Sequence, residues 1–138
     1  VTRNFADIDF PVFRLPEMYL IYAEAVLRGG TGGDAATALG YLNLIRARAG
    51  ASLFTASDLS PATTGLQNIL NERGRELYWE GHRRTDLVRY NLLTTGTYLW
   101  PLKGGVASGT AVDSKYNIFP VPTTNRTSNP NLTQNTGY

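Results

Sequence analysis

The sequence predicts a mostly α-helical fold with a long irregular C-terminal segment, and two observations lead to this prediction. Between residues 16 and 92, apolar side chains recur at the 3.6-residue spacing of amphipathic helices, and helix-capping or helix-breaking residues bound each periodic stretch. Residues 96–138 are instead rich in Gly, Thr, Asn, Ser and Pro and show no helical period. Because long structureless tails are unusual in compact domains, we expect this segment to wrap over the helices.

The first helix is predicted over residues 17–28. Pro16 suits the first helical turn, where its missing N–H leaves no bond unmade. Gly29, followed by a second glycine, ends the helix.

The second helix is predicted to begin after Asp34, a favourable N-cap, and to end at Gly50. Only a short Gly-rich turn separates the two helices. We therefore expect residues 16–50 to form an antiparallel helix hairpin.

Two further helices are predicted within residues 66–92, after a Ser/Thr/Ala-rich loop. The first covers residues 66–80 and is broken by Gly81, and the second covers residues 83–92. Trp79 falls inside the first of these helices, and we expect it to pack in the core.

The composition narrows the class of protein. The chain has 138 residues, enough for one compact domain, and 42% of them are hydrophobic. The absence of cysteine excludes a disulfide scaffold and a thiol nucleophile. The net charge is only +2, and the arginines are interleaved with carboxylates, so we expect no nucleic-acid partner. No segment approaches the roughly 18–20 apolar residues that span a bilayer.

The most charged stretch places Glu72, Glu76 and Glu80 at i, i+4 and i+8 of a predicted helix. Like charges at this spacing repel and need cationic partners. The arginines that could supply them are Arg46, Arg48, Arg75, Arg83, Arg84 and Arg89. We interpret the stretch as an ion-pair network, including Asp86, that locks the helices together.

A glycosidase that uses Glu76 or Glu80 is the enzymatic alternative, since glycoside hydrolysis needs a pair of carboxyl groups. A general acid requires a raised pKa, whereas neighbouring arginines favour the ionised form. We therefore predict no catalytic residue. The single histidine, His82, has no metal-ligand partner at a suitable spacing, and we predict neither a metal site nor a cofactor.

Trp100 and Tyr98 are the candidate ligand-binding residues. They lie between two glycine-bearing loops, and binding residues are often carried by loops on a rigid scaffold. An indole offers a large flat face on which a sugar ring can stack. The competing interpretation is that both side chains only pin the C-terminal segment onto the helices.

Four motifs in the chain resemble those of the RagB/SusD family, in the same order. The first is Arg14-x-x-Glu17-x-x-Leu20-x-x-Ala23-Glu24-Ala25. The second is Leu42-Asn43-x-x-Arg46-x-Arg48-Ala49-Gly50. The third is Glu72-Arg73-x-x-Glu76-Leu77-x-x-Glu80-Gly81-x-Arg83-x-x-Asp86-Leu87-x-Arg89. The last is Phe119-Pro120-Val121-Pro122 followed by Asn129-Pro130-Asn131-Leu132-x-Gln134-Asn135-x-Gly137-Tyr138.

The resemblance implies that residues 1–138 are the C-terminal region of a SusD-like protein, with residues 16–50 similar to its last tetratricopeptide-like helix pair. Members of the family are outer-membrane lipoproteins on the cell surface of Bacteroidetes. They bind glycans or other nutrients, are not enzymes, and cap a SusC-like TonB-dependent transporter. The N-terminal lipid anchor that the resemblance implies would lie outside these residues. The alternative function is a helical protein-interaction scaffold without direct sugar contact.

Overall fold

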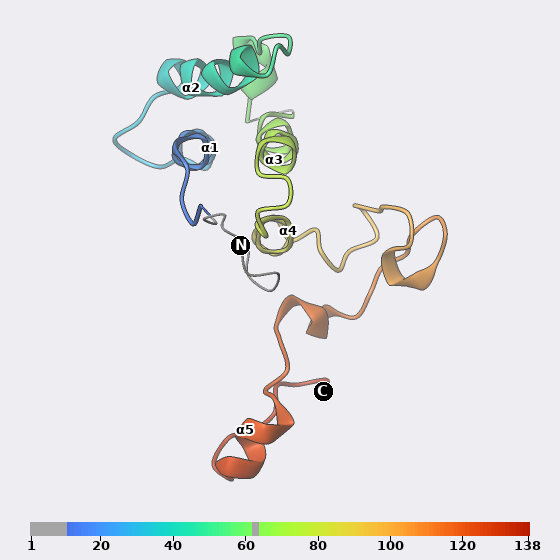
Figure 1. The fold of residues 1–138 in the computed structure, drawn as a ribbon. Helices are drawn as coiled ribbons and strands as arrows, with labels where there is room; N and C mark the ends of the chain where they lie inside the picture. The colour runs from blue at the N-terminus through green and yellow to red at the C-terminus, as the bar shows by residue number, and fades with distance from the viewer. Residues whose placement is uncertain (1–10, 62–63) are drawn as a thin grey trace, which may run out of the picture. The chain divides into compact units, whose positions relative to one another are not determined.

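A computed structural model describes residues 11–61 and 64–138 of the chain. The described residues form five α-helices and three short 3-10 helices, without any strand, which confirms the mostly helical prediction (Figure 1). The chain divides into two compact units, Val1–Gly81 and His82–Tyr138, and each is described by itself. Within the described ranges, no helix is both long enough and apolar enough to cross a membrane.

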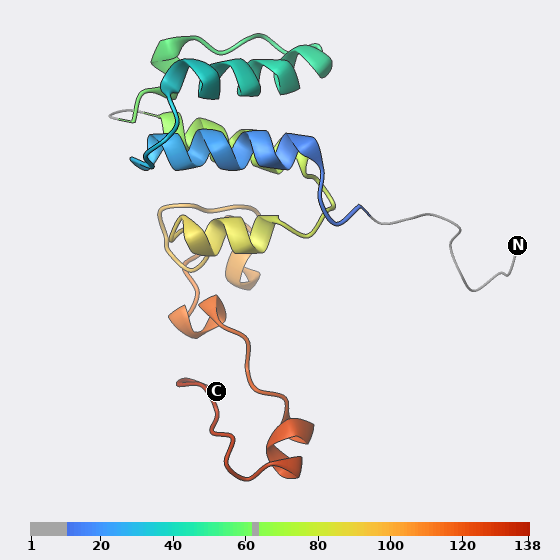
Figure 2. The ribbon, with the colours of Figure 1, turned by 90° about the vertical axis from the view of Figure 1, so that its left-hand side faces the viewer.

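The first unit contains α1 (Leu15–Leu27), α2 (Ala35–Arg48) and α3 (Gly65–Glu76). Helix α1 packs against both α2 and α3, and α1 and α2 run side by side in opposite directions, as the short turn predicted (Figure 2). Apolar side chains from all three helices form the core. They include Leu20, Ala23, Leu27, Ala38, Leu42, Ile45 and Ile69.

The ends of α1 and α2 lie close to the predicted positions because the expected capping residues act there. Gly29, with φ of 86°, follows the last turn of α1 in the left-handed region. The Asp34 carboxylate accepts a hydrogen bond from the backbone N–H of Thr37 at 2.8 Å and caps the start of α2. Gly50, with φ of 68°, lies just beyond the end of α2.

Helix α3 ends at Glu76, four residues earlier than predicted. Trp79 adopts a left-handed conformation with φ of 66°, and Gly81 follows with φ of 82°, so the chain leaves the helix before the predicted break. The prediction that Trp79 packs in the core was wrong. Its side chain is 87% exposed, because it stands in this turn and not on the inner face of α3, where Leu77 is buried at the end of the helix.

The second unit contains α4 (Arg83–Arg89) and α5 (Thr123–Ser128), with short 3-10 helices at Lys103–Gly105 and Ser114–Asn117. Helix α4 ends three residues before the predicted boundary, and Asn91 follows in the left-handed region. The rest of this unit is mostly irregular, as its composition predicted. The three short helical turns within residues 96–138 were not predicted, since none is long enough to show a hydrophobic period.

Within the second unit, hydrogen bonds hold the irregular segment to α4 and to itself. The Arg84 guanidinium donates to the Tyr116 carbonyl at 2.6 Å. The Tyr138 hydroxyl donates to the carbonyl of Ile118 at 2.9 Å. The side-chain amide of Gln134 accepts a hydrogen bond from the backbone N–H of Val121 and donates one to the Val121 carbonyl. The segment is therefore tied to α4 at Tyr116 and to itself further along, despite its lack of periodic structure.

Candidate functional site

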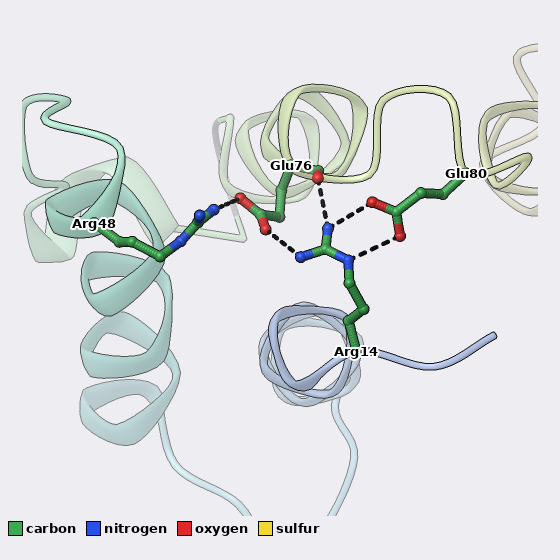
Figure 3. Close-up of polar contacts among 4 residues, drawn as sticks. All are labelled: Arg14, Arg48, Glu76 and Glu80. Carbon is green, nitrogen blue, oxygen red and sulfur yellow. Dashed lines mark hydrogen bonds and ion pairs between the residues drawn. The ribbon is translucent and has the colours of Figure 1, made fainter. Parts of the chain in front are cut away.

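Glu76 and Glu80, the two carboxylates considered as a possible acid catalyst, both form ion pairs with arginines. The Arg14 guanidinium donates to both oxygens of Glu80, at 2.6 and 3.0 Å, and to Oε1 and the carbonyl of Glu76, at 3.0 and 2.8 Å (Figure 3). The other carboxylate oxygen of Glu76 accepts from Arg48 of α2 at 2.5 Å. All four carboxylate oxygens of this pair therefore have arginine donors.

A second part of the same network lies one turn earlier on α3. The buried Glu72 carboxylate accepts from Arg46 of α2 at 2.6 Å and from Arg75 of α3 at 2.7 Å. The network thus connects α3 with α2 and with the residue that precedes α1. This is the structural role expected for Glu72, Glu76 and Glu80.

Arg14 is the member of the network that the charge pattern did not reveal. It lies more than sixty residues from its partners, and only its place in the first family motif marked it as special. The hydrogen bond with Glu80 contributes most to raising the pKa of Arg14 above its ordinary value, and the contacts with Glu76 raise it further.

In the second unit, the remaining charged residues of the motif lie on α4. Asp86 is buried and pairs with Arg89 at 2.9 Å. Arg83 donates a hydrogen bond to the Tyr98 hydroxyl and lies over the Tyr98 ring. Residues 11–61 and 64–138 include no cluster of three or more side chains suited to hold a metal ion.

Two neighbouring hollows of about 420 and 450 Å³ lie in the second unit, and both are bordered by Trp100, Leu93 and Arg84. The smaller one is also lined by Tyr98 and Arg83, and the larger one by Lys103 and aromatic residues of the C-terminal segment. The rings of Tyr98 and Trp100 lie 6.3 Å apart, centre to centre, with an angle of 59° between them. The structure therefore brings the two predicted ligand-binding residues together beside a concave surface.

Lys103 organises the loop that carries these aromatic rings. Its ammonium group is buried and donates to the carbonyl oxygens of Leu92, Thr95 and Tyr98, at 3.3, 2.5 and 2.7 Å. The same ammonium lies over the Trp100 ring, 4.7 Å from its centre. Three carbonyl dipoles and one aromatic face thus surround a buried cation, which makes its burial tolerable.

Two glycines allow the close packing of this loop. Gly104 has φ of 65°, and a Cβ there would lie 2.6 Å from Thr110 Cγ2. Gly109 has φ of 80°, and a Cβ there would lie 2.5 Å from the Trp100 carbonyl oxygen. Larger residues would therefore strain the backbone and displace the segment beneath Trp100.

Trp100 retains an exposed fraction of 37%, and Tyr98 is half-buried. A fully buried indole would have ruled out contact with a ligand, so the exposure is compatible with a binding role. The contacts with Arg83 and Lys103 also fit the competing interpretation, in which both rings anchor the loop. Sequence reasoning missed Lys103 as a structural centre, because a single lysine in a Gly-rich segment carries no pattern.

Comparisons with known proteins agree on the family. The model of the SusD family matches residues 1–138, so the chain belongs to this family. It is 43% identical over 135 residues to the starch-binding protein SusD of Bacteroides thetaiotaomicron, an alignment that covers 98% of the chain and 22% of that protein.

The fold comparison gives the same result. The chain superimposes on a crystal structure of a SusD superfamily protein from Parabacteroides distasonis ATCC 8503 with a TM-score of 0.68 and 26% sequence identity. The match covers 96% of the chain and 28% of that protein. The chain therefore spans about a quarter of the length of the relatives it matches.

Proposed function

We propose that this chain is part of a cell-surface glycan-binding protein and that the hollows beside Trp100 and Tyr98 contact the ligand. The observation that carries the proposal is a partly exposed indole, fixed in place by a buried lysine, at the rim of a concave surface. Aromatic rings stack on the apolar faces of sugars and leave the ring hydroxyls free for polar contacts. The similarity to a starch-binding protein supports a glycan as the ligand.

The proposal extends to the place of this region in a larger assembly. In it, residues 1–138 form the C-terminal region of an outer-membrane lipoprotein that delivers its ligand to a SusC-like TonB-dependent transporter. Family membership supports this proposal. A binding role also suits the carboxylates of Glu76 and Glu80, which are engaged by arginines and not left facing a substrate.

Isothermal titration of the intact protein with maltooligosaccharides and with other plant and host glycans tests the binding function. Saturable binding of at least one glycan, without release of reducing sugar from it, is the expected result. Absence of binding to every glycan would contradict the proposal, and release of reducing sugar would favour the glycosidase alternative.

A helical interaction scaffold is the second candidate function, and one observation favours it. Leu15, Met18 and Ile21 are exposed at helical spacing on the face of α1 opposite Leu20 and Ala23. A helix with apolar residues on both faces is typically covered by a neighbour. Co-purification of the intact protein with its transporter, compared between wild type and Ile21→Glu, tests whether this face binds a partner.

A further inference from the structure

We infer that the hollows beside Trp100 select an anionic oligosaccharide, one that carries carboxylate or sulfate groups, over a neutral glucan. This inference rests on the proposed glycan-binding function and adds the charge class of the ligand. It is carried by the distribution of charge around the hollows and by the contacts of Arg84.

Cations dominate the second unit. Its positively charged side chains are Arg83, Arg84, Arg89, Lys103, Lys115 and Arg126. Its acidic side chains are Asp86 and Asp113. Three of the cations, Arg83, Arg84 and Lys103, line the hollows, and neither acidic residue does.

Both acidic side chains have partners of their own, and neither lines the hollows. Asp86 is buried and pairs with Arg89 on α4. The Asp113 carboxylate accepts the backbone N–H of Lys115 at 2.8 Å and caps a short 3-10 helix. The charged side chains that line the hollows are therefore three cations, and neither carboxylate of this unit is among them.

Arg84 is the cation best placed to meet an anionic group. Its side chain is half-buried, donates one hydrogen bond to the Tyr116 carbonyl, and stacks on the Phe119 ring at 3.9 Å from the ring centre. These contacts fix the guanidinium plane while using only part of its five donors. Across the described part of the chain, Arg84 forms no ion pair with a carboxylate.

The arrangement matches the two parts of an acidic sugar. The indole of Trp100 offers a face for the pyranose ring, and a fixed guanidinium at the same rim can bind a carboxylate or sulfate through two parallel hydrogen bonds. Arg84 would bond the hydroxyls of a neutral glucan without the opposite charge and the two parallel hydrogen bonds that a carboxylate or sulfate provides, which favours the acidic sugar.

Isothermal titration of the intact protein with three probes of equal length tests the inference. The probes are an oligogalacturonate, a sulfated galactan oligosaccharide and a maltooligosaccharide. We expect at least one anionic probe to bind about tenfold or more tightly than the neutral probe, since charge-assisted hydrogen bonds are about twice as strong as neutral ones. We also expect its affinity to fall as salt is raised.

The matched variants are Arg84→Gln and Arg126→Gln, which remove one positive charge each from the second unit. Arg84→Gln is expected to weaken the anionic probe about tenfold, and Arg126→Gln, on α5 and outside the lining of both hollows, to leave it nearly unchanged. Arg84→Lys keeps the charge and should retain part of the affinity. It serves as the test variant if a melting curve shows that Arg84→Gln is unfolded.

The outcomes separate this inference from the proposed function. Tighter binding of the maltooligosaccharide than of both anionic probes would overturn the inference and leave glycan binding intact. Equal losses in Arg84→Gln and Arg126→Gln would also overturn it. A failure of all three probes would overturn this inference, whereas the proposed function would fall only if no glycan of the wider panel bound. Preference for the galacturonate or for the sulfated probe supports the inference and distinguishes carboxylate from sulfate recognition.

Discussion

Arg14 and Glu80 form a two-bond ion pair in which Nη2 and Nε of the guanidinium donate to the two carboxylate oxygens, at 2.6 and 3.0 Å. The pair closes the first unit, because it joins the residue before α1 to the turn that follows α3. Glu80 retains only 18% of its side-chain exposure, so the pair is largely shielded from water. Arg14 also bonds the carbonyl of Glu76, which satisfies a backbone group at the end of α3.

Removal of one partner of this pair is expected to destabilise the fold without affecting ligand binding. Glu80→Ala leaves the Arg14 guanidinium partly unpaired at a shielded position, at a cost of about 3 kcal/mol in the free energy of unfolding. Urea denaturation of Arg14→Ala, Glu80→Ala and the double variant measures the coupling between the two residues. If the losses of the two single variants add up to the loss of the double variant, the pair contributes nothing to the free energy of unfolding. Loss of glycan affinity at unchanged stability would contradict the structural role.

The N-cap of α2 is expected to make stability depend on pH in the acid range. The hydrogen bonds from the backbone N–H and hydroxyl of Thr37 hold the pKa of Asp34 below its usual value. Their contribution is therefore complete above the unfolded pKa of about 3.9 and is lost as the pH falls through the lower pKa of the folded state.

Asp34→Asn is the control for this effect, because an asparagine keeps the oxygen acceptor but does not titrate. The difference in free energy of unfolding between wild type and Asp34→Asn should be constant near neutral pH. At pH values below about 4, the wild type should lose stability relative to Asp34→Asn. A difference that stays constant through the acid range would contradict the role of the ionised carboxylate.

The exposed apolar face of α1 is expected to promote association of the 138-residue chain. Leu15, Met18 and Ile21 present contiguous apolar surface, and such patches drive contact between molecules. Met18→Glu with Ile21→Glu should reduce self-association at equal concentration, as measured by sedimentation velocity. Leu53→Glu, an exposed leucine in the loop after α2, is the matched control and should have little effect. Equal behaviour of all three proteins would exclude this face as a contact surface.

Lys103 is expected to hold Trp100 in place. Lys103→Met removes the donor for three carbonyl groups and should lower the stability of the loop that carries Trp100 by about 2–3 kcal/mol. In a Trp79→Phe background, where Trp100 is the remaining tryptophan, its fluorescence should become more accessible to an added quencher. Lys115→Met is the control, because Lys115 contacts Gly137 and Tyr138 and not the Trp100 loop. Unchanged quenching in Lys103→Met would refute this role.

Helix positions in the first unit were predictable where local chemistry decides them. Asp34 and Gly29 act as caps whatever lies elsewhere in the chain, and α1 and α2 have bounds close to those expected. The end of α3 was not predictable in this way. Periodicity favoured a helix through Glu80, but the bond from Arg14 holds Glu80 beyond the last helical turn and Trp79 takes a left-handed conformation.

Some residues of the candidate site could likewise be predicted from the sequence, and others could not. Trp100 and Tyr98 could be selected because loops on a rigid scaffold often carry binding residues, and the structure places the two rings beside each other at a hollow. Arg84 and Lys103 could not be selected, since their importance comes from the path of residues 92–119 over α4. That path depends on single hydrogen bonds to backbone carbonyls, which leave no pattern in the sequence.

The glycan affinity of Trp100→Ala, compared with that of Trp79→Ala in the intact protein, shows whether the hollows beside Trp100 bind the ligand. Both variants remove one exposed tryptophan, but only Trp100 borders the hollows. We expect Trp100→Ala to weaken binding of the best glycan about tenfold in a protein that remains folded, and Trp79→Ala to bind as the wild type does. Wild-type affinity in a folded Trp100→Ala protein would contradict the account and assign this indole to anchoring alone.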